Sequence, residues 1–175
     1  VTVDGTAVST VTKTAIDGGY KCTCTSPTLK DGSHTISVKA SDNDGNAAAA
    51  KTATFTVDTV PPTLQITAPS NDLITNKKTV TVSGKTDDVS SKPVTVTVSG
   101  VTVTVGTDGT FTKDVTLVEG ANTITIVAKD KAGKTTTVTR KVTVDTSAPV
   151  IKSVTLTRNP VDCGKTFIIA VEITD

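Results

Sequence analysis

The chain has 175 residues, with 18 Lys and Arg against 17 Asp and Glu, and only 2% of its residues are aromatic. This balanced charge argues against nucleic acid binding, which needs a basic stripe, and gives no reason to expect a membrane surface. No apolar stretch approaches the ~20 residues of a spanning helix, so no membrane insertion is expected. The 39 Thr and 26 Val are β-branched and suit strands better than helices.

A segment in the first part of the chain recurs in the second. Residues 29–40 match residues 117–128, and residues 56–62 match residues 143–149. A repeat of this size corresponds to a domain, so we predict a tandem array.

The second repeat alternates apolar and polar residues through short strands bounded by Gly, Asp or Pro. Ser99-Gly100 is expected to form a two-residue hairpin turn, and Asp108-Gly109 marks a further turn. About seven or eight strands in one repeat predict an antiparallel β-sandwich of immunoglobulin type, so the fold class is all-β. In chain order, the expected strands lie at residues 63–67, 79–82, 94–98, 101–105, 111–117, 123–128 and 138–144.

Residues 119–134 (EGANTITIVAKDKAGK) and 144–149 (VDTSAP) resemble the bacterial Ig-like domains. That resemblance implies a module of secreted enzymes, surface adhesins or phage tail proteins, hence an extracellular, cell-surface or virion-tail location. It implies a spacer, scaffold or adhesive surface, and it brings no catalytic residue. The chain differs from eukaryotic immunoglobulin domains in lacking the core Trp and the paired inter-sheet Cys.

The first residue of the chain falls inside a repeat and not at the start of one. Residues 1–5 align with residues 96–100, so we divide the chain into three parts. Residues 1–59 form an Ig-like domain without its first two strands, residues 60–146 a complete domain, and residues 147–175 the first two strands of a further domain. The sequence contains no Met, so we expect a processed or trimmed N-terminus.

Two interpretations of this phase stay open, with a chain nicked between the second and third strands as an intermediate case. The chain is either a window on a longer array, or its tail completes the first domain of a neighbouring subunit by strand donation. The second interpretation predicts head-to-tail self-association into a filament. The residues expected to assemble it are Ile151, Val154, Phe167, Ile169, Val171 and Ile173.

The three cysteines, Cys22, Cys24 and Cys163, form an odd set for an extracellular protein. Cys22 and Cys24 are two apart on one strand, which is too far for a disulfide, and the expected register also disfavours a Cys22–Cys163 bond. We therefore predict a free thiol or an intermolecular disulfide. The alternative is three buried or unreactive thiols.

The segment from Asp42 to Asn46 is acidic and contains Gly, like part of a calcium loop, so Asp42 and Asp44 are weak calcium candidates. Its alternative is a turn in which the Asp side chains bond the local backbone. No other cofactor is expected. Asp58 and Asp145 precede prolines and are expected to cap linker turns, and Asp87-Asp88 is expected to be a solvated loop tip.

Catalysis is not expected, because His34 is the only His and no Ser-His-Asp set, zinc cluster or phosphate loop is visible. We expect His34 to be exposed and Phe55, Phe111 and Phe167 to lie at core positions. The sequence predicts a non-catalytic extracellular structural module, either a filament or appendage subunit assembled by strand complementation or a stalk segment of a longer protein. The alternative is an adhesion module whose loops recognise a host glycan or protein.

Overall fold

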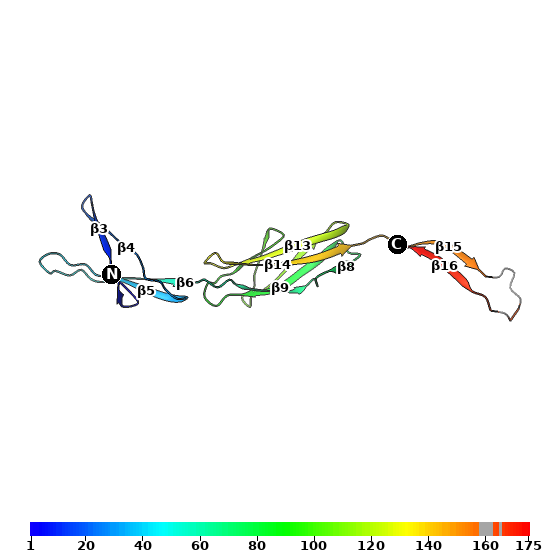
Figure 1. The fold of residues 1–175 in the computed structure, drawn as a ribbon, viewed down its shortest axis with the longest axis horizontal. Helices are drawn as coiled ribbons and strands as arrows, with labels where there is room; N and C mark the ends of the chain where they lie inside the picture. Colours follow the sequence, from blue (N-terminus) through cyan, green and yellow to red (C-terminus); the bar gives the residue numbers. More distant parts are fainter. Residues whose placement is uncertain (158–162, 165) are drawn as a thin grey trace.

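The computed structural model describes residues 1–157, 163–164 and 166–175, and within them it contains strands β1 to β16 and no helix. Consequently, no helix in this part of the chain could span a membrane. The strands fall into three units that follow one another along the long axis (Figure 1). The all-β prediction is confirmed.

The middle unit is a complete sandwich of two sheets (Figure 1). One sheet has the order β11-β10-β13-β14-β8 and the other the order β12-β9-β7. Its strands are β7 (Thr63–Ala68), β8 (Leu73–Thr75), β9 (Thr79–Asp87), β10 (Thr95–Val98), β11 (Val101–Val103), β12 (Thr110–Thr116), β13 (Gly120–Lys129) and β14 (Thr135–Val144).

The core of this unit is built from the inward-facing residues of both sheets. Val and Ile dominate it, and Phe111 is its only aromatic side chain, in keeping with the 2% aromatic content of the chain. These inward-facing residues confirm the alternation of apolar and polar residues from which the strands were predicted. The fully or nearly buried members are Val82, Val96, Val98, Val103, Phe111, Leu117, Ile124, Ile126, Ala128, Val142 and Val144.

The first two strands of the chain repeat the hairpin of β10 and β11. Ser99 and Gly100 have φ of 48° and 82°, and Asp4 and Gly5 have φ of 50° and 79°. Two consecutive positive φ values are what a two-residue type I′ hairpin turn requires. The alignment of residues 1–5 with residues 96–100 is therefore confirmed.

The strand β8 was not expected from the sequence. It is three residues long and pairs in parallel with β14, with Leu73 opposite Val142 and Thr75 opposite Val144. This is the one parallel pairing among the described strands, in a fold that the sequence predicted as antiparallel.

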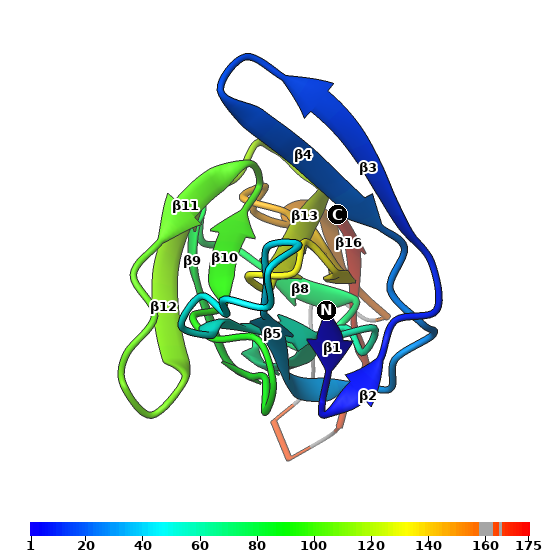
Figure 2. The same ribbon diagram turned by 90° about the vertical axis from the view of Figure 1, so that its left-hand side faces the viewer.

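The first unit is open on one side. Its main sheet has the order β2-β1-β5-β6, and β3 and β4 form a separate hairpin that projects away from it (Figures 1 and 2). The strands are β1 (Thr2–Val3), β2 (Thr6–Ala7), β3 (Val11–Ile16), β4 (Gly19–Cys24), β5 (Gly32–Val38) and β6 (Lys51–Val57).

The projecting hairpin follows from a missing partner. Tyr20 of β4 stands where Phe111 stands in β12, each shortly after an Asp-Gly turn. β12 pairs with β9, but the first unit has no counterpart of β9, so β4 pairs with β3 instead. Tyr20 is therefore 62% exposed, whereas Phe111 is 3% exposed.

The third unit is a hairpin of β15 (Val150–Leu156) and β16 (Ile169–Thr174). Phe167 is exposed beside it, so its expected core position is not occupied in this structure, because no second sheet lies against the hairpin. Phe55 of β6 is half-buried and lies 5.5 Å from the His34 ring, measured between ring centroids.

Candidate functional site: an aspartate cluster at the first junction

Three aspartates meet where the first unit leads into the middle unit, and each directly follows the last residue of a strand. Asp58 follows β6 of the first unit, Asp88 follows β9, and Asp130 follows β13. We call Asp58, Asp88 and Asp130 the aspartate cluster. One carboxylate oxygen from each residue lies within 4.8 Å of the others.

The cluster is buried. Asp58, Asp88 and Asp130 are 8%, 6% and 5% exposed. The expectation that Asp88 is a solvated loop residue was wrong, because the loop after β9 folds back over the side chain instead of extending into solvent.

Backbone N–H groups hold one oxygen of each carboxylate. Oδ1 of Asp58 accepts the N–H of Val60 at 3.1 Å, and Oδ1 of Asp130 accepts the N–H of Lys134 at 2.8 Å. The predicted capping of the linker turn by Asp58 is thus confirmed. Oδ1 of Asp88 accepts the N–H groups of Ser90 and Ser91, at 2.8 and 2.7 Å.

The opposite oxygens of two members have no partner. Oδ2 of Asp58 and Oδ2 of Asp130 are buried without a hydrogen bond among the described residues. The ion pairs of this part of the chain, His34–Asp4 and Lys92–Asp87, do not reach the cluster. Buried polar atoms are normally paired, so these two oxygens mark the position as unusual.

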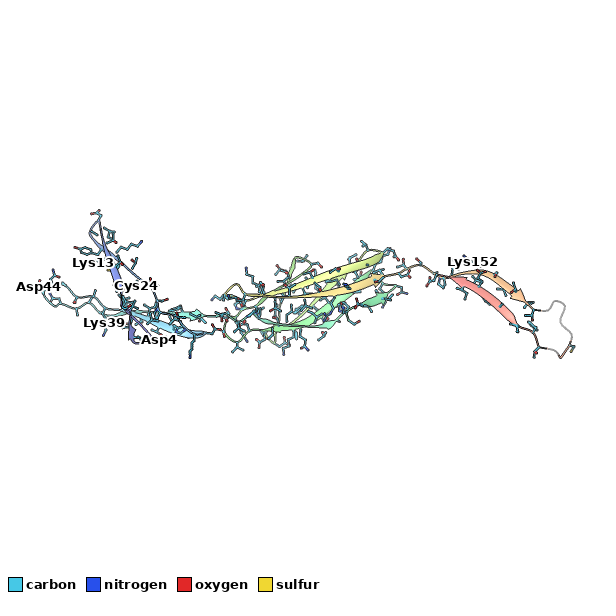
Figure 3. All side chains as sticks on the ribbon, viewed as in Figure 1. Asp4, Lys13, Cys24, Lys39, Asp44 and Lys152 are labelled. Atoms are coloured by element: carbon cyan, nitrogen blue, oxygen red, sulfur yellow. The ribbon has the colours of Figure 1, made fainter. Side chains whose placement is uncertain are left out.

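The calcium candidates of the sequence lie elsewhere. Asp44 lies at the far tip of the first unit (Figure 3). Oδ1 of Asp42 accepts the N–H groups of Asp44 and Asn46, and its Oδ2 accepts the Asn46 side-chain amide. These bonds lower the pKa of Asp42, with the Asn46 side chain as the largest cause. The alternative of a locally bonded turn is confirmed, and calcium binding there stays a prediction.

All three cysteine thiols are exposed and unbonded. Cys22 and Cys24 lie on β4 in the projecting hairpin, and Figure 3 places Cys24 there. The expectation that the thiols could be buried is therefore wrong, because no sheet covers β4 and Cys163 is exposed too, whereas their being unreactive stays a prediction. An intermolecular disulfide through any of the three stays a prediction.

The residues predicted to assemble subunits share one hairpin. Ile151 lies opposite Ile173, and Val154 opposite Val171, which places these side chains on one face with Ile169. This face is exposed. The hairpin is therefore amphipathic, as half of a sandwich would be, and assembly through it stays a prediction.

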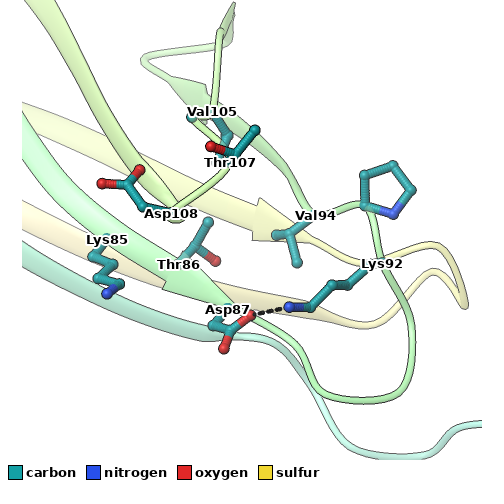
Figure 4. Close-up of a pocket in the computed structure, with 11 residues that line it drawn as sticks. Lys85, Thr86, Asp87, Lys92, Val94, Val105, Thr107 and Asp108 are labelled. Carbon is teal, nitrogen blue, oxygen red and sulfur yellow. Dashed lines mark ion pairs between the residues drawn. The ribbon is translucent and has the colours of Figure 1, made fainter.

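A surface pocket of about 380 Å³ lies between the end of β9 and the turn at residues 106–109 (Figure 4). Lys92 Nζ and Asp87 Oδ1 are 2.9 Å apart across it, and this contact is the main cause that lowers the pKa of Asp87. Its apolar lining comes from Pro93, Val94 and Val105, with no aromatic side chain. Stacking on a sugar ring, the usual contribution of an aromatic residue, is not available there.

His34 was expected to be exposed, but its side chain is largely buried. Its side chain is 11% exposed, its Nδ1 lies 2.6 Å from Asp4 Oδ2, and its Nε2 donates to the carbonyl of Lys30 at 2.8 Å. The hydrogen bond with Asp4 raises the pKa of His34, and the same bond lowers the pKa of Asp4. Asn122, its counterpart in the middle unit, likewise donates to the carbonyl of Val118 at 2.7 Å. The contacts of His34, like those of Asn122, therefore join neighbouring segments of its own unit.

The geometry defines one complete Ig-like β-sandwich between two partial units, and family models match the first and middle units. Residues 1–59 match the family model of the bacterial Ig-like domain, and residues 62–146 match that of glucodextranase domain B. The resemblance to bacterial Ig-like domains is thus confirmed by the model that matches residues 1–59, and the middle unit matches the model of glucodextranase domain B.

Bacillopeptidase F of Bacillus subtilis (strain 168) is 32% identical over 140 residues. The match covers 80% of this chain but only 9% of that protein. Among solved structures, a tetra-tandem repeat from the extending region of a large adhesion protein is 23% identical with a TM-score of 0.42, covering 91% of this chain and 50% of that one. Fibronectin(III)-like modules of Clostridium thermocellum CbhA are 18% identical with a TM-score of 0.37, covering 47% and 97%.

Proposed function

We propose that the chain is a non-catalytic structural segment of an extracellular tandem array, which holds other parts of a larger protein apart. The observation that carries this proposal is the end-to-end order of Ig-like units along one axis (Figure 1). The similarity to a short part of a bacillopeptidase supports the view that such units accompany other domains.

The two outer units support the same proposal, because each leaves apolar surface uncovered. Tyr20 is exposed on the projecting hairpin of the first unit, and the apolar face of β15 and β16 has no opposing sheet. A half-sandwich with an open core is aggregation-prone, so both units call for additional strands.

Small-angle X-ray scattering of the chain tests the spacer role. A second copy of residues 60–146, inserted in series, should lengthen the maximum dimension by about 35 Å, because the ten-residue strands β13 and β14 rise ~3.4 Å per residue. An unchanged dimension, with the two sandwiches side by side, would contradict the proposal.

A specific observation favours a second candidate, head-to-tail self-assembly. The apolar hairpin of β15 and β16 corresponds to the strands that the first unit lacks, so one subunit could supply them to the next. Phe167→Asp, which places a charge beside the apolar face, should abolish assembly and leave the middle unit folded. Filaments in negative-stain electron micrographs of the wild-type chain, absent in the variant, support this candidate, and monomers at every concentration reject it.

A further inference from the structure

We propose that the aspartate cluster binds a calcium ion at the junction between the first and middle units. The proposal is independent of the spacer role, since it concerns the occupancy of one site by one ion. It depends on the positions of Asp58, Asp88 and Asp130, their burial and their unused oxygens.

The spacing of the carboxylates fits a single ion. Calcium binds oxygen at about 2.3–2.6 Å, so two oxygens that share one ion lie at most about 5 Å apart. The three oxygens of the cluster lie within 4.8 Å of one another. Three separate strand ends, from β6, β9 and β13, thus place oxygens at distances that one ion can bridge.

Asp58 and Asp130 are each held by one carboxylate oxygen, and the other oxygen makes no hydrogen bond among the described residues. The backbone N–H groups of Val60 and Lys134 hold Oδ1 of Asp58 and of Asp130, which fixes where the second oxygen points. Both of these second oxygens are buried and unpaired, and no hydrogen bond joins one carboxylate to another among the described residues. A cation would satisfy them.

The charge of the cluster also calls for a cation. Burying like charges together costs free energy unless an opposite charge accompanies them. Lys92, a cationic side chain of the adjoining loop, is paired with Asp87 instead. Among the described residues, no Lys, Arg or His forms an ion pair with a member of the cluster.

The ligand type selects the ion. The cluster offers carboxylate oxygens alone, with no Cys or His, which suits a hard cation and not zinc or copper. Calcium tolerates irregular geometry and completes its shell with water and backbone carbonyls, whereas magnesium demands a near-ideal octahedron. A cavity of about 270 Å³, between Val60-Pro61 and residues 87–90, borders Asp88 on one side of the cluster.

The repeat supplies matched controls within the same chain. Asp145 is the counterpart of Asp58 and accepts the N–H of Ser147 at 2.9 Å in the same way, but it is exposed. Asp42 is the counterpart of Asp130, but the Asn46 side chain occupies its second oxygen. Neither lies in a group of three carboxylates within the described residues.

Isothermal titration calorimetry on the metal-free 175-residue chain tests the site, with CaCl₂, MgCl₂ and ZnCl₂ titrated separately. We expect one calcium per chain with a dissociation constant below about 1 mM, the range of extracellular calcium modules. Asp130→Asn and Asp88→Asn should each weaken binding at least about tenfold, because each removes a ligand charge and keeps an oxygen acceptor for the backbone. Asp145→Asn should bind as the wild type does.

Thermal unfolding separates loss of binding from loss of fold. Calcium should raise the melting temperature of the wild type and of Asp145→Asn, and leave that of Asp130→Asn unchanged. In chelator, Asp130→Asn should melt no lower than the wild type, since the substitution removes a buried charge. The proposal is overturned if the wild type takes up no calcium at several millimolar, if Asp130→Asn binds calcium normally, or if magnesium or zinc binds more tightly than calcium.

Discussion

The repeat places two aromatic residues at one structural position, buried in one unit and exposed in the other, and this predicts unequal effects of the same truncation. Phe111 lies directly opposite Gly84 on β9, and its Cζ is 2.7 Å from the point where a Cβ on residue 84 would stand. The ring therefore fills the space above a residue without a side chain. Phe111→Ala should leave a cavity beside Gly84, which has no side chain to fill it, and the Ile66 side chain borders that space.

Phe111→Ala is expected to lower the free energy of unfolding by about 3–5 kcal/mol, the usual range for truncating a buried Phe. For a domain of this size each kcal/mol lowers the melting temperature by about 4–8 °C, so the middle unit should melt at least about 12 °C earlier. Tyr20→Ala should cost less than about 1 kcal/mol, since it removes an exposed ring and one contact with Lys13, whose Nζ lies 3.8 Å from the ring centroid.

Differential scanning calorimetry of the chain and the two variants measures both effects, and amide exchange on β13 identifies the transition of the middle unit. Equal losses for the two variants would refute the reasoning, because they would mean that Tyr20 is also buried against a second sheet. A loss below about 1 kcal/mol for Phe111→Ala would refute the assignment of the core.

Three further predictions concern backbone, pH and thiols. Gly109→Ala should lower the free energy of unfolding by more than about 2 kcal/mol, because φ is 82° and the added Cβ would meet the carbonyl of Thr86. Gly133→Ala should lower it by about 1 kcal/mol, because φ is 90° but the space around the residue is open. Equal urea midpoints for the two variants would contradict this expectation. The raised pKa of His34 makes its contribution complete below its ordinary value of 6.5 and lost as pH rises through the raised value. The lowered pKa of Asp4 makes its contribution complete above 3.8 and lost as pH falls, so amide protection of β1 and β5 should be greatest between these values. His34→Asn should flatten that profile on the neutral side, and an NMR pKa of His34 at or below 6.5 would contradict the expectation. All three cysteines should react with a thiol reagent in the native chain, and slow reaction of any of them would show that it is covered in solution.

The sandwich of the middle unit could be predicted because its strands alternate and its turns carry Gly, Asp or Pro. β8 escaped prediction because three residues, Leu73–Thr75, are too few to show a period, and because its partner β14 is distant in sequence. The projecting hairpin escaped prediction for another reason. β4 has the pattern of a sandwich strand, and its pairing with β3 depends on a partner that is missing from the unit.

The aspartate cluster was not predicted because each member, taken alone, has the signature of a turn. Asp58, Asp88 and Asp130 do bond local backbone N–H groups, as turn aspartates do. Their burial arises only when β6, β9 and β13 end at the same place. The expected strands end at residues 82 and 128 and none was expected to end at residue 57, so only the observed ends of β6, β9 and β13 bring the three aspartates together.

The parallel pairing of β8 with β14 determines how the middle unit bears mechanical load. When the chain is pulled from its neighbours at both ends, β14 is drawn toward the third unit and β8 is held back toward the first. Two parallel strands pulled in opposite directions slide along each other, so the bonds joining residues 73–75 to residues 142–144 resist in shear and must break together. Because of the three-residue edge strand β8, unfolding of the middle unit under tension therefore requires these hydrogen bonds to break at once and not one after another.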